Sequence, residues 1–254
     1  MTREQVWKHK RAGRPTSSAV KVLCTGGRAN RTPEEIRVAK LFKDTRSTKD
    51  VEFGEGAMTY VYELVREKRR NKPTFNADNK NFRWGHNQEP YAIKWLRNAY
   101  PDWNIRHCSD EDEFADIVFN IAECGLGDSP DFYVGEDIIG EVKCPVDEAK
   151  FERIREMTRE EAREEHEYQF AGHFIGDPNV KSLIYFIYDG QNDDDEDDVL
   201  DVLDPDRGIV FTYTREEFQP LIDEITGKVK RVCEFIEMCV NGECKVRDIN
   251  SILI

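Results

Sequence analysis

The stretch GDSPDFYVGEDIIGEVKCP, residues 127–145, constrains the fold of this chain more than any other. Two short apolar runs flank the polar residues 135–137, a pattern that predicts two strands joined by a tight bend. Successive strand side chains point to opposite faces, so Glu141 and Lys143 share one face of the second strand. We expect the bend to fold Asp131 back towards Glu141.

The residue types in this stretch indicate a particular chemistry. Two carboxylates that meet at one point, Asp131 and Glu141, are costly unless a cation or a proton lies between them. Mg²⁺ prefers one or two carboxylates, its own waters and substrate phosphate. Lys143 beside such an ion could orient a water or offset charge on phosphorus, so the three residues predict a metal-dependent phosphodiesterase. The alternative is an ordinary Ser-Pro-Asp turn followed by the solvated face of an edge strand.

Length and composition describe a water-soluble globular protein. The chain has 254 residues, of which 39% are hydrophobic and 35% charged, which is enough to bury a substantial core. The longest apolar run, residues 183–188, is far shorter than the roughly 20 residues of a membrane span. The N-terminus has no apolar export signal. We therefore expect a cytoplasmic protein with no membrane partner.

The net charge of −14 is unevenly distributed. Residues 1–83 carry 20 Lys and Arg against 10 Asp and Glu, and the remainder carries 17 against 41. A basic N-terminal third on an acidic chain indicates localised contact with nucleic acid. The acidic run 193–198 repels itself and predicts a mobile loop without EF-hand spacing.

The N-terminal third contains a candidate phosphate site. Pro15 and the following hydroxyl residues predict a helix that starts near Ser17. The free N–H groups of a helix N-terminus attract phosphate, and Arg11 and Arg14 lie beside them in the sequence. The alternative is a basic, capped surface helix.

Glu89 is a candidate third carboxylate. Pro90 fits only in the first turn of a helix, which places Glu89 at or near a helix start. Helix-dipole stabilisation alone would also explain a glutamate at this position.

Further helices are predicted over 54–67, 146–163, 166–175 and 215–238, and further strands over 114–119, 182–188 and 209–213. On the helix 166–175, Gln169, His166 and His173 lie away from the core face, and we interpret the two histidines as structural.

The seven cysteines do not form a disulfide pattern. Cys233, Cys239 and Cys244 cluster near the C-terminus and Cys24 lies far away, an arrangement weakly similar to nucleases that hold an iron–sulfur cluster. No C-x-x-C pair is present, so buried thiols are the simpler interpretation.

Four separated segments resemble one family in the same order. They are Arg11–Ser18 (RAGRPTSS, matching R-x-G-x-x-T-x-S), Trp84–Glu89 (WGHNQE, matching W-G-x-x-x-E), SPD at 129–131 with EVKCP at 141–145, and Tyr168-Gln169. The chain thereby resembles the YqaJ-like viral recombinases, or lambda-exonuclease-like family, of the PD-(D/E)xK nuclease superfamily. Pro90 and Arg14-Pro15 depart from the family pattern, and Pro90 puts the metal role of Glu89 in doubt.

The resemblance implies an α/β (α+β) fold with a restriction-endonuclease-like core, a central mixed sheet flanked by helices. It implies a single nuclease domain that spans residues 1–254. Within this domain we expect a basic, helical N-terminal region over 1–83, a catalytic core over 84–190, an acidic loop over 191–206 and a C-terminal strand and helix over 207–254.

The resemblance also implies roles for individual residues. Mg²⁺ or Mn²⁺ would be bound by Asp131, Glu141, the main-chain carbonyl of Val142 and, as an assisting ligand, Glu89. Lys143 would position the attacking water with support from Gln169. The terminal 5′-phosphate would be bound by Arg11, Ser18 and Ser129.

The activity implied is 5′→3′ exonucleolytic digestion of one strand of linear duplex DNA, which leaves a 3′ overhang for a single-strand annealing protein. Relatives form a trimeric ring around DNA. Two alternatives remain open from the sequence. The same metal motif serves structure-specific and restriction-like endonucleases, and the carboxylates could also persist in a non-catalytic DNA-binding accessory protein.

Overall fold

The computed structural model describes residues 1–74, 80–190 and 204–253. The predicted acidic run 193–198, and with it most of the loop 191–206, lies outside the described residues. Within the described ranges, no helix combines the length and apolar character that crossing a bilayer requires.

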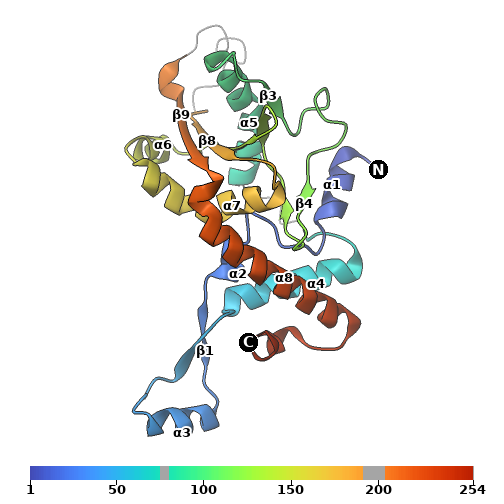
Figure 1. The fold of residues 1–254 in the computed structure, drawn as a ribbon, viewed down its shortest axis with the longest axis vertical. Helices are drawn as coiled ribbons and strands as arrows, with labels where there is room; N and C mark the ends of the chain where they lie inside the picture. Colours follow the sequence, from blue (N-terminus) through green and yellow to red (C-terminus); the bar gives the residue numbers. More distant parts are fainter. Residues whose placement is uncertain (75–79, 191–203, 254) are drawn as a thin grey trace.

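A five-stranded mixed sheet forms the centre of the fold, with the strand order β3-β6-β7-β8-β9 (Figure 1). Strands β7 and β8 are parallel, and the other neighbours are antiparallel. The strands are β3 (Ile105–His107), β6 (Phe132–Val134), β7 (Ile138–Lys143), β8 (Ser182–Tyr188) and β9 (Gly208–Thr214). The predicted α/β fold with a central mixed sheet is confirmed.

The α-helices and shorter elements surround this sheet. The helices are α1 (Arg3–Arg11), α2 (Lys21–Cys24), α3 (Pro33–Leu41), α4 (Glu55–Arg70), α5 (Lys80–Ala99), α6 (Glu148–Arg155), α7 (Arg159–Gly176), α8 (Gln219–Asn241) and α9 (Ile249–Ile252). The shorter elements are β1 (Gly27–Asn30), β2 (Thr48–Val51), β4 (Asn120–Ile121), β5 (Gly127–Asp128) and 3₁₀ turns at Pro205–Arg207, Arg215–Phe218 and Val246–Asp248.

Strand β8 shows why the sheet is covered on both faces. Its residues 183, 185 and 187 pack into a core with α6, α7 and the first half of α8. Residues 184, 186 and 188 pack into a second core with α5. Alternate side chains point to opposite faces, so an uninterrupted apolar run requires a helical layer on each side. The predicted interior strand over 182–188 is confirmed.

A third apolar cluster joins the N-terminal and C-terminal regions of the chain. Helix α4 packs its buried face against the second half of α8 and the C-terminal helix α9. Asn250 fixes this contact, since its side chain accepts a hydrogen bond from the Phe53 N–H at 2.9 Å and donates one to the Phe53 carbonyl at 2.7 Å. Helix α4 covers the predicted helix 54–67 and extends to Arg70.

An arm projects from the rest of the chain (Figure 1). Strands β1 and β2 pair antiparallel from Gly27 with Val51 to Asn30 with Thr48, and α3 lies at the tip. Thr32 caps α3 through a reciprocal capping box with Glu35, an arrangement that satisfies two helix N–H groups that would otherwise lack partners.

Several sequence predictions differ from the structure. Residues 114–119 do not form a strand. The predicted helix 215–238 begins with a 3₁₀ turn and continues as α8 to Asn241. The seven cysteines are free thiols, and Cys239 Sγ lies 3.3 Å from Cys244 Sγ. Burial raises the pKa of Cys24 to about 11, as expected for an inert buried thiol.

Candidate active site

One cleft brings together nine of the ten predicted site residues. It has a volume of about 680 Å³ and is bordered by α1, the turn that follows it, α5, the β6–β7 hairpin and α7. The predicted residues that line it are Arg11, Ser18, Glu89, Ser129, Asp131, Glu141, Val142, Lys143 and Gln169. Metal-site and phosphate-site residues, which are far apart in the sequence, therefore share one cavity.

The β6–β7 hairpin places the two central carboxylates as predicted. Gly135 at its bend has a φ of +61°, a left-handed conformation that glycine adopts without strain. The Asp131 N–H donates to the Gly140 carbonyl at 3.1 Å, and the Asp131 Oδ2 accepts from the Val142 N–H at 2.7 Å. Asp131 is thus held against the start of the Glu141–Lys143 segment by backbone contacts on both sides.

The electrostatics of this pair are asymmetric. Burial, together with the negative charges of Glu141 and Glu89, raises the pKa of Asp131 well above its ordinary value. Burial also opposes ionisation of Glu141, but the positive charges of Lys143 and His173 outweigh it and lower the pKa of Glu141 to about 2. Glu141 is therefore a stable anion, whereas the surroundings of Asp131 favour the protonated, neutral form of its carboxyl group.

Lys143 and Gln169 both contact Glu141. The Lys143 ammonium forms an ion pair with Glu141 Oε1, and the Gln169 side-chain amide donates to the same oxygen at 2.7 Å. Burial alone would lower the pKa of Lys143, but the charges of Glu141 and Asp131 raise it. Lys143 consequently remains a cation at neutral pH and is unsuited to act as a general base.

His173 is a component of the site that the sequence prediction assigned to a merely structural role. It is completely buried, with Nε2 2.9 Å from Glu141 Oε2 and Nδ1 2.8 Å from Asp128 Oδ1. The Asp128 contact is an ion pair whose angles do not meet those of a hydrogen bond. Burial would lower the pKa of His173, but Asp128 and Glu141 raise it to about 10. A buried imidazolium thus bridges two buried carboxylates behind the cleft.

Close packing of α7 makes this bridge possible. Gly176 lies against Asp128, where an added Cβ would approach the Asp128 Cβ to 2.4 Å. Any larger residue at 176 would push α7 away from Asp128 and lengthen the contact to His173.

Glu89 enters the cleft from the middle of a helix, and the prediction of a helix start at this position is wrong. Pro90 lies inside α5, which extends from Lys80 to Ala99. An interior proline removes one backbone hydrogen bond and costs about 3 kcal/mol. Burial of Ala92, Ile93 and Leu96 on the inner face of α5 offsets this cost.

The contacts of Glu89 place its charge near the central pair. Its Oε1 lies 2.7 Å from Nε2 of His107 on β3, and its negative charge contributes to the raised pKa of Asp131. The structure therefore brings all three predicted carboxylates to one region.

The predicted helix beginning near Ser17 is wrong. Residues 16–20 form turns, and α2 covers only Lys21–Cys24. The reason is a pairing with β5: the Ser17 N–H donates to the Gly127 carbonyl at 3.0 Å, and the Gly127 N–H donates to the Pro15 carbonyl at 2.8 Å. This pairing holds residues 15–17 extended beside β5, and the helix begins only at Lys21.

Hydroxyl groups nonetheless gather at this end of the cleft. Thr16 and Ser17, which the sequence prediction did not select, line it together with Ser18 and Ser129. The Ser129 hydroxyl donates to the Val118 carbonyl at 3.1 Å. Arg11, in the last turn of α1, lies with its guanidinium 5.4 Å from the centre of the Trp7 ring.

Arg14 is the one predicted site residue that the structure does not bring to this cleft. It lines a separate hollow beside Lys68 and Cys233. Gly13, with a φ of +70°, turns the chain between Arg11 and Arg14, and its N–H donates to Glu67 Oε2 at 3.0 Å. This turn directs the two arginines to different surfaces.

Comparisons with known proteins identify the fold. Searches of protein-family models and of curated protein sequences give no match. Among solved structures, the chain is similar to an alkaline exonuclease (LHK-Exo) from Laribacter hongkongensis, with a TM-score of 0.62 and 17% identity over 94% of this chain and 95% of that one.

Two further structures give the same result. The complex of LHK-Exo with dAMP matches with a TM-score of 0.60, 17% identity and the same coverage. A phage related exonuclease from Haemophilus somnus 129PT matches with a TM-score of 0.57 and 15% identity over 91% of this chain and 96% of that one. The chain therefore has the fold of the alkaline and phage-related exonucleases, and the fold predicted from the sequence resemblance is confirmed.

Proposed function

We propose that this protein is a metal-dependent 5′→3′ exonuclease that digests one strand of linear duplex DNA from a 5′-phosphorylated end. The observation that carries the proposal is the shared cleft: Arg11 and the hydroxyls of Ser18 and Ser129 line the same cavity as Asp131, Glu141 and Lys143. A nuclease that acts only at DNA ends needs a binding site for the terminal phosphate next to the residues that catalyse hydrolysis. The similar structures include two exonucleases, one of which is described in complex with dAMP, a nucleoside monophosphate.

The acidic residues fit a hard divalent cation. The raised pKa of Asp131 reflects burial and the negative charges of Glu141 and Glu89, and a Mg²⁺ or Mn²⁺ ion would offset these effects and favour the ionised carboxylate. Among the described residues, no three His, Cys, Asp or Glu side chains form a complete metal-binding group. Mg²⁺ ordinarily takes only one or two carboxylates and completes its shell with waters and substrate phosphate. We assign Asp131, Glu141 and the Val142 carbonyl as its ligands, with Glu89 assisting.

The protein's own residues then have distinct roles. A bound cation supplies Lewis-acid stabilisation of the charge that develops on the phosphoryl oxygens. Lys143, a permanent cation, orients the attacking water and adds to this stabilisation. Gln169 and His173 hold Glu141, which receives hydrogen bonds from both. These side chains keep the metal-binding carboxylate in one orientation.

Hydrolysis at the first internucleotide phosphate explains how the enzyme could remove one nucleotide after another from the same strand. The water oxygen bonds to phosphorus, the bond from phosphorus to the 3′ oxygen breaks, and that oxygen takes up a proton. The products are a 5′-mononucleotide and a strand with a new 5′-phosphate. That phosphate can occupy the binding site formed by Arg11, Ser18 and Ser129, so each cleavage step produces the 5′-phosphate that the next step recognises.

The remaining elements of the proposal come from the sequence resemblance and the charge distribution. We infer one nuclease domain, a homotrimeric ring around DNA, action in the host cytoplasm and a 3′ overhang that an annealing protein uses in phage-type recombination. A ring would place the basic N-terminal segments towards the DNA and the acidic remainder outside. Light scattering of the purified protein tests the ring, and a monomer in solution would contradict it.

Digestion of end-labelled DNA tests the activity. A linear duplex is labelled separately at each 5′ and 3′ end, with and without 5′-phosphate, and incubated in Mg²⁺ or Mn²⁺. We expect immediate release of the 5′ label as a mononucleotide, gradual shortening of the 3′-labelled strand, and faster digestion of phosphorylated ends. Nicking of closed circular DNA would instead indicate an endonuclease. DNA binding without digestion in either metal would indicate a non-catalytic accessory protein.

A further inference from the structure

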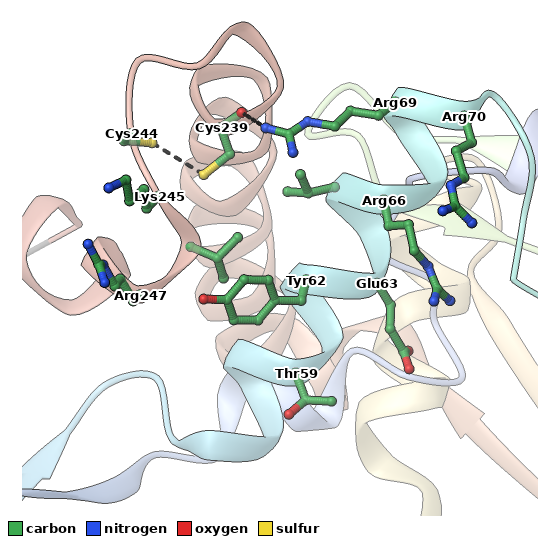
Figure 2. Close-up of a pocket in the computed structure, with 12 residues that line it drawn as sticks. Thr59, Tyr62, Glu63, Arg66, Arg69, Arg70, Cys239, Cys244, Lys245 and Arg247 are labelled. Atoms are coloured by element: carbon green, nitrogen blue, oxygen red, sulfur yellow. Dashed lines mark hydrogen bonds between the residues drawn. The ribbon is translucent and has the colours of Figure 1, made fainter.

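A second large groove lies between α4 and the C-terminal segment, and it shares no lining residue with the catalytic cleft among the described residues. Its volume is about 760 Å³. Figure 2 shows cationic side chains on both of its walls. The residues that matter to its chemistry are Tyr62, Arg66, Arg69 and Arg70 of α4, with Lys245 and Arg247 of the C-terminal segment. We call this hollow the α4 groove.

The α4 groove has an excess of positive charge, although the guanidinium of Arg247 lies 3.9 Å from the Asp248 carboxylate. Among the described residues that line it, five are cationic and one, Glu63, is a carboxylate. The cationic residues are exposed, and two of them use neutral partners: Arg66 donates to the Thr74 hydroxyl at 2.7 Å, and Arg69 donates to the Cys239 carbonyl. Neutral partners orient a guanidinium without cancelling its charge. On a chain with a net charge of −14, this field attracts an anion to one place.

The spacing of the cations suits a linear polyanion. Arg66, Arg69 and Arg70 are three and four residues apart and therefore share one helix face, which continues through Tyr62 to Thr59. From Thr59 to Arg70 this face is about 16 Å long at 1.5 Å per residue. One strand of duplex DNA carries a phosphate about every 3.4 Å along its axis. The three arginines occupy only residues 66–70 of this face, about 6 Å at the same rise, so they can meet about two consecutive phosphates, while the carboxylate Glu63 lies on the other half of the face.

The side chains favour nucleic acid over an acidic peptide. Three of the five cations are arginines on one helix, and guanidinium groups match phosphate oxygens with two parallel hydrogen bonds. Tyr62 is 51% exposed on the same face, where its hydroxyl can donate a hydrogen bond to a phosphate oxygen. Guanidinium groups bind carboxylates in the same bidentate way, so the argument for nucleic acid rests on the regular spacing of the arginines along one helix face and not on the arginine side chains alone.

The chain also connects the groove directly with the catalytic cleft. Helix α4 ends at Arg70, and helix α5 begins at Lys80. Asn81 and Phe82, in the first turn of α5, line the catalytic cleft. One wall of the groove, α4, and one wall of the cleft, α5, are therefore consecutive helices of the chain.

We propose that the α4 groove binds the sugar–phosphate backbone of DNA outside the catalytic cleft and retains the substrate between cleavage steps. The proposal rests on the proposed nuclease function, because DNA is then the polyanion that the protein meets. It predicts that the groove governs affinity and the number of nucleotides removed per encounter, and that it does not govern the chemical step.

The test compares two double variants with equal charge change. Arg70→Gln/Lys245→Gln removes two exposed cations of the groove, and Lys150→Gln/Arg153→Gln removes two exposed cations of α6. Arg69 is left intact because it bonds to the backbone of α8. Binding of a fluorescent 30-base-pair duplex is measured without metal over a range of salt concentrations.

For the groove variant we expect weaker duplex binding, by roughly 10- to 60-fold near 0.1 M salt, and a slope of log affinity against log salt reduced by about 1.8. With a DNA trap present, it should also remove fewer nucleotides per encounter, while the cleavage rate at saturating DNA stays within about twofold of wild type. The α6 variant should match wild type in all three measurements.

Three outcomes would overturn the proposal. Equal binding by the groove variant and wild type would remove the groove from DNA contact and leave the nuclease function intact. Wild-type protein that neither binds nor digests the duplex would overturn both proposals together. A fluorescent poly-glutamate peptide that binds wild type more tightly than the duplex does, and loses affinity in the groove variant, would assign the groove to an acidic protein partner.

Discussion

Replacement of His173 tests the buried charge bridge behind the candidate active site. The variant His173→Gln keeps a hydrogen-bond donor but removes the positive charge between Asp128 and Glu141, both of which are buried. Removing one partner of a buried ion pair costs about 3–5 kcal/mol because it leaves an uncompensated charge in the interior. We expect a loss of that size in the free energy of unfolding near pH 6.

The pH dependence separates this charge effect from simple loss of packing. The pKa of His173 is raised from 6.5 to about 10 in the folded protein. The stabilisation from its proton is therefore fully present below pH 6.5 and is lost as the pH rises towards 10. The difference in unfolding free energy between wild type and variant should shrink over this window by up to about 1.4 kcal/mol per pH unit.

Urea denaturation between pH 6 and pH 10 measures this difference, and His166→Gln is the matched control. His166 lies on the same helix, but burial and the charge of Lys143 lower its pKa to about 4. His166 is therefore neutral in both the folded and the unfolded state above about pH 7.5, and the control difference should stay constant from there to pH 10, whereas the His173→Gln difference should still fall. A His173→Gln difference that is equally large at pH 6 and pH 10 would refute the charge bridge.

Three further predictions concern the cleft. Lys143→Ala should lower Mg²⁺-dependent digestion by about 10²–10³-fold while the circular dichroism spectrum is retained; digestion at the wild-type rate would remove Lys143 from catalysis. Asp131→Asn should also abolish digestion, yet raise the free energy of unfolding in EDTA by about 0.5–2 kcal/mol at pH 7. The pKa of the Asp131 carboxyl is raised in the folded wild type, so the free energy of unfolding of the wild type falls as the pH rises above 3.8. An Asn variant that is less stable than the wild type at pH 7 would contradict this account. Arg11→Ala should erase the preference for 5′-phosphorylated over 5′-hydroxyl duplex ends, whereas Arg14→Ala, directed to another surface, should leave the preference unchanged.

The features of the fold that the sequence predicts are those set by local pattern. The β6–β7 hairpin depends on two short apolar runs and one bend, so Asp131 and Glu141 could be brought together without knowledge of the remaining chain. Strand β8 follows from an uninterrupted apolar run, and helices α4 and α8 follow from apolar residues that repeat with the spacing of one helix face. These predictions are correct because the local sequence pattern alone determines each element, and contacts with distant parts of the chain do not change it.

The predictions that fail are those decided by distant contacts. The turn at Ser17 follows a hydrogen-bonded pairing with Gly127, more than one hundred residues away. Pro90 is tolerated inside α5 because the opposite face of that helix is buried on the sheet. Helical periodicity placed His173 away from the core face, yet its side chain is completely buried. A signal was present, since His173 follows Gln169 by one helical turn and Asp128 stands next to the motif, but only the folded chain shows that one side chain reaches both carboxylates.

The positive charge of the N-terminal third divides between two surfaces. Residues 1–25 carry six cations against one anion, residues 26–54 seven against five, and residues 55–83 seven against four. In the arm formed by 26–54, most of the cations are paired with carboxylates of the same arm, such as Arg31 with Asp44 at 2.7 Å. The excess therefore lies at α1, beside the catalytic cleft, and at the end of α4, in the α4 groove.

If these two surfaces bind DNA as separate sites, their contributions should be independent. Free energies of substitutions that share no partner add to within about 0.3–0.5 kcal/mol. The increase in Kd for duplex DNA caused by Arg11→Ala, multiplied by the increase caused by Arg70→Gln, should therefore match the increase in the double variant to within about twofold. Measured by fluorescence anisotropy without metal, a double variant no weaker than the worse single variant would show that the two arginines act on one site, since a contact already lost cannot be lost again.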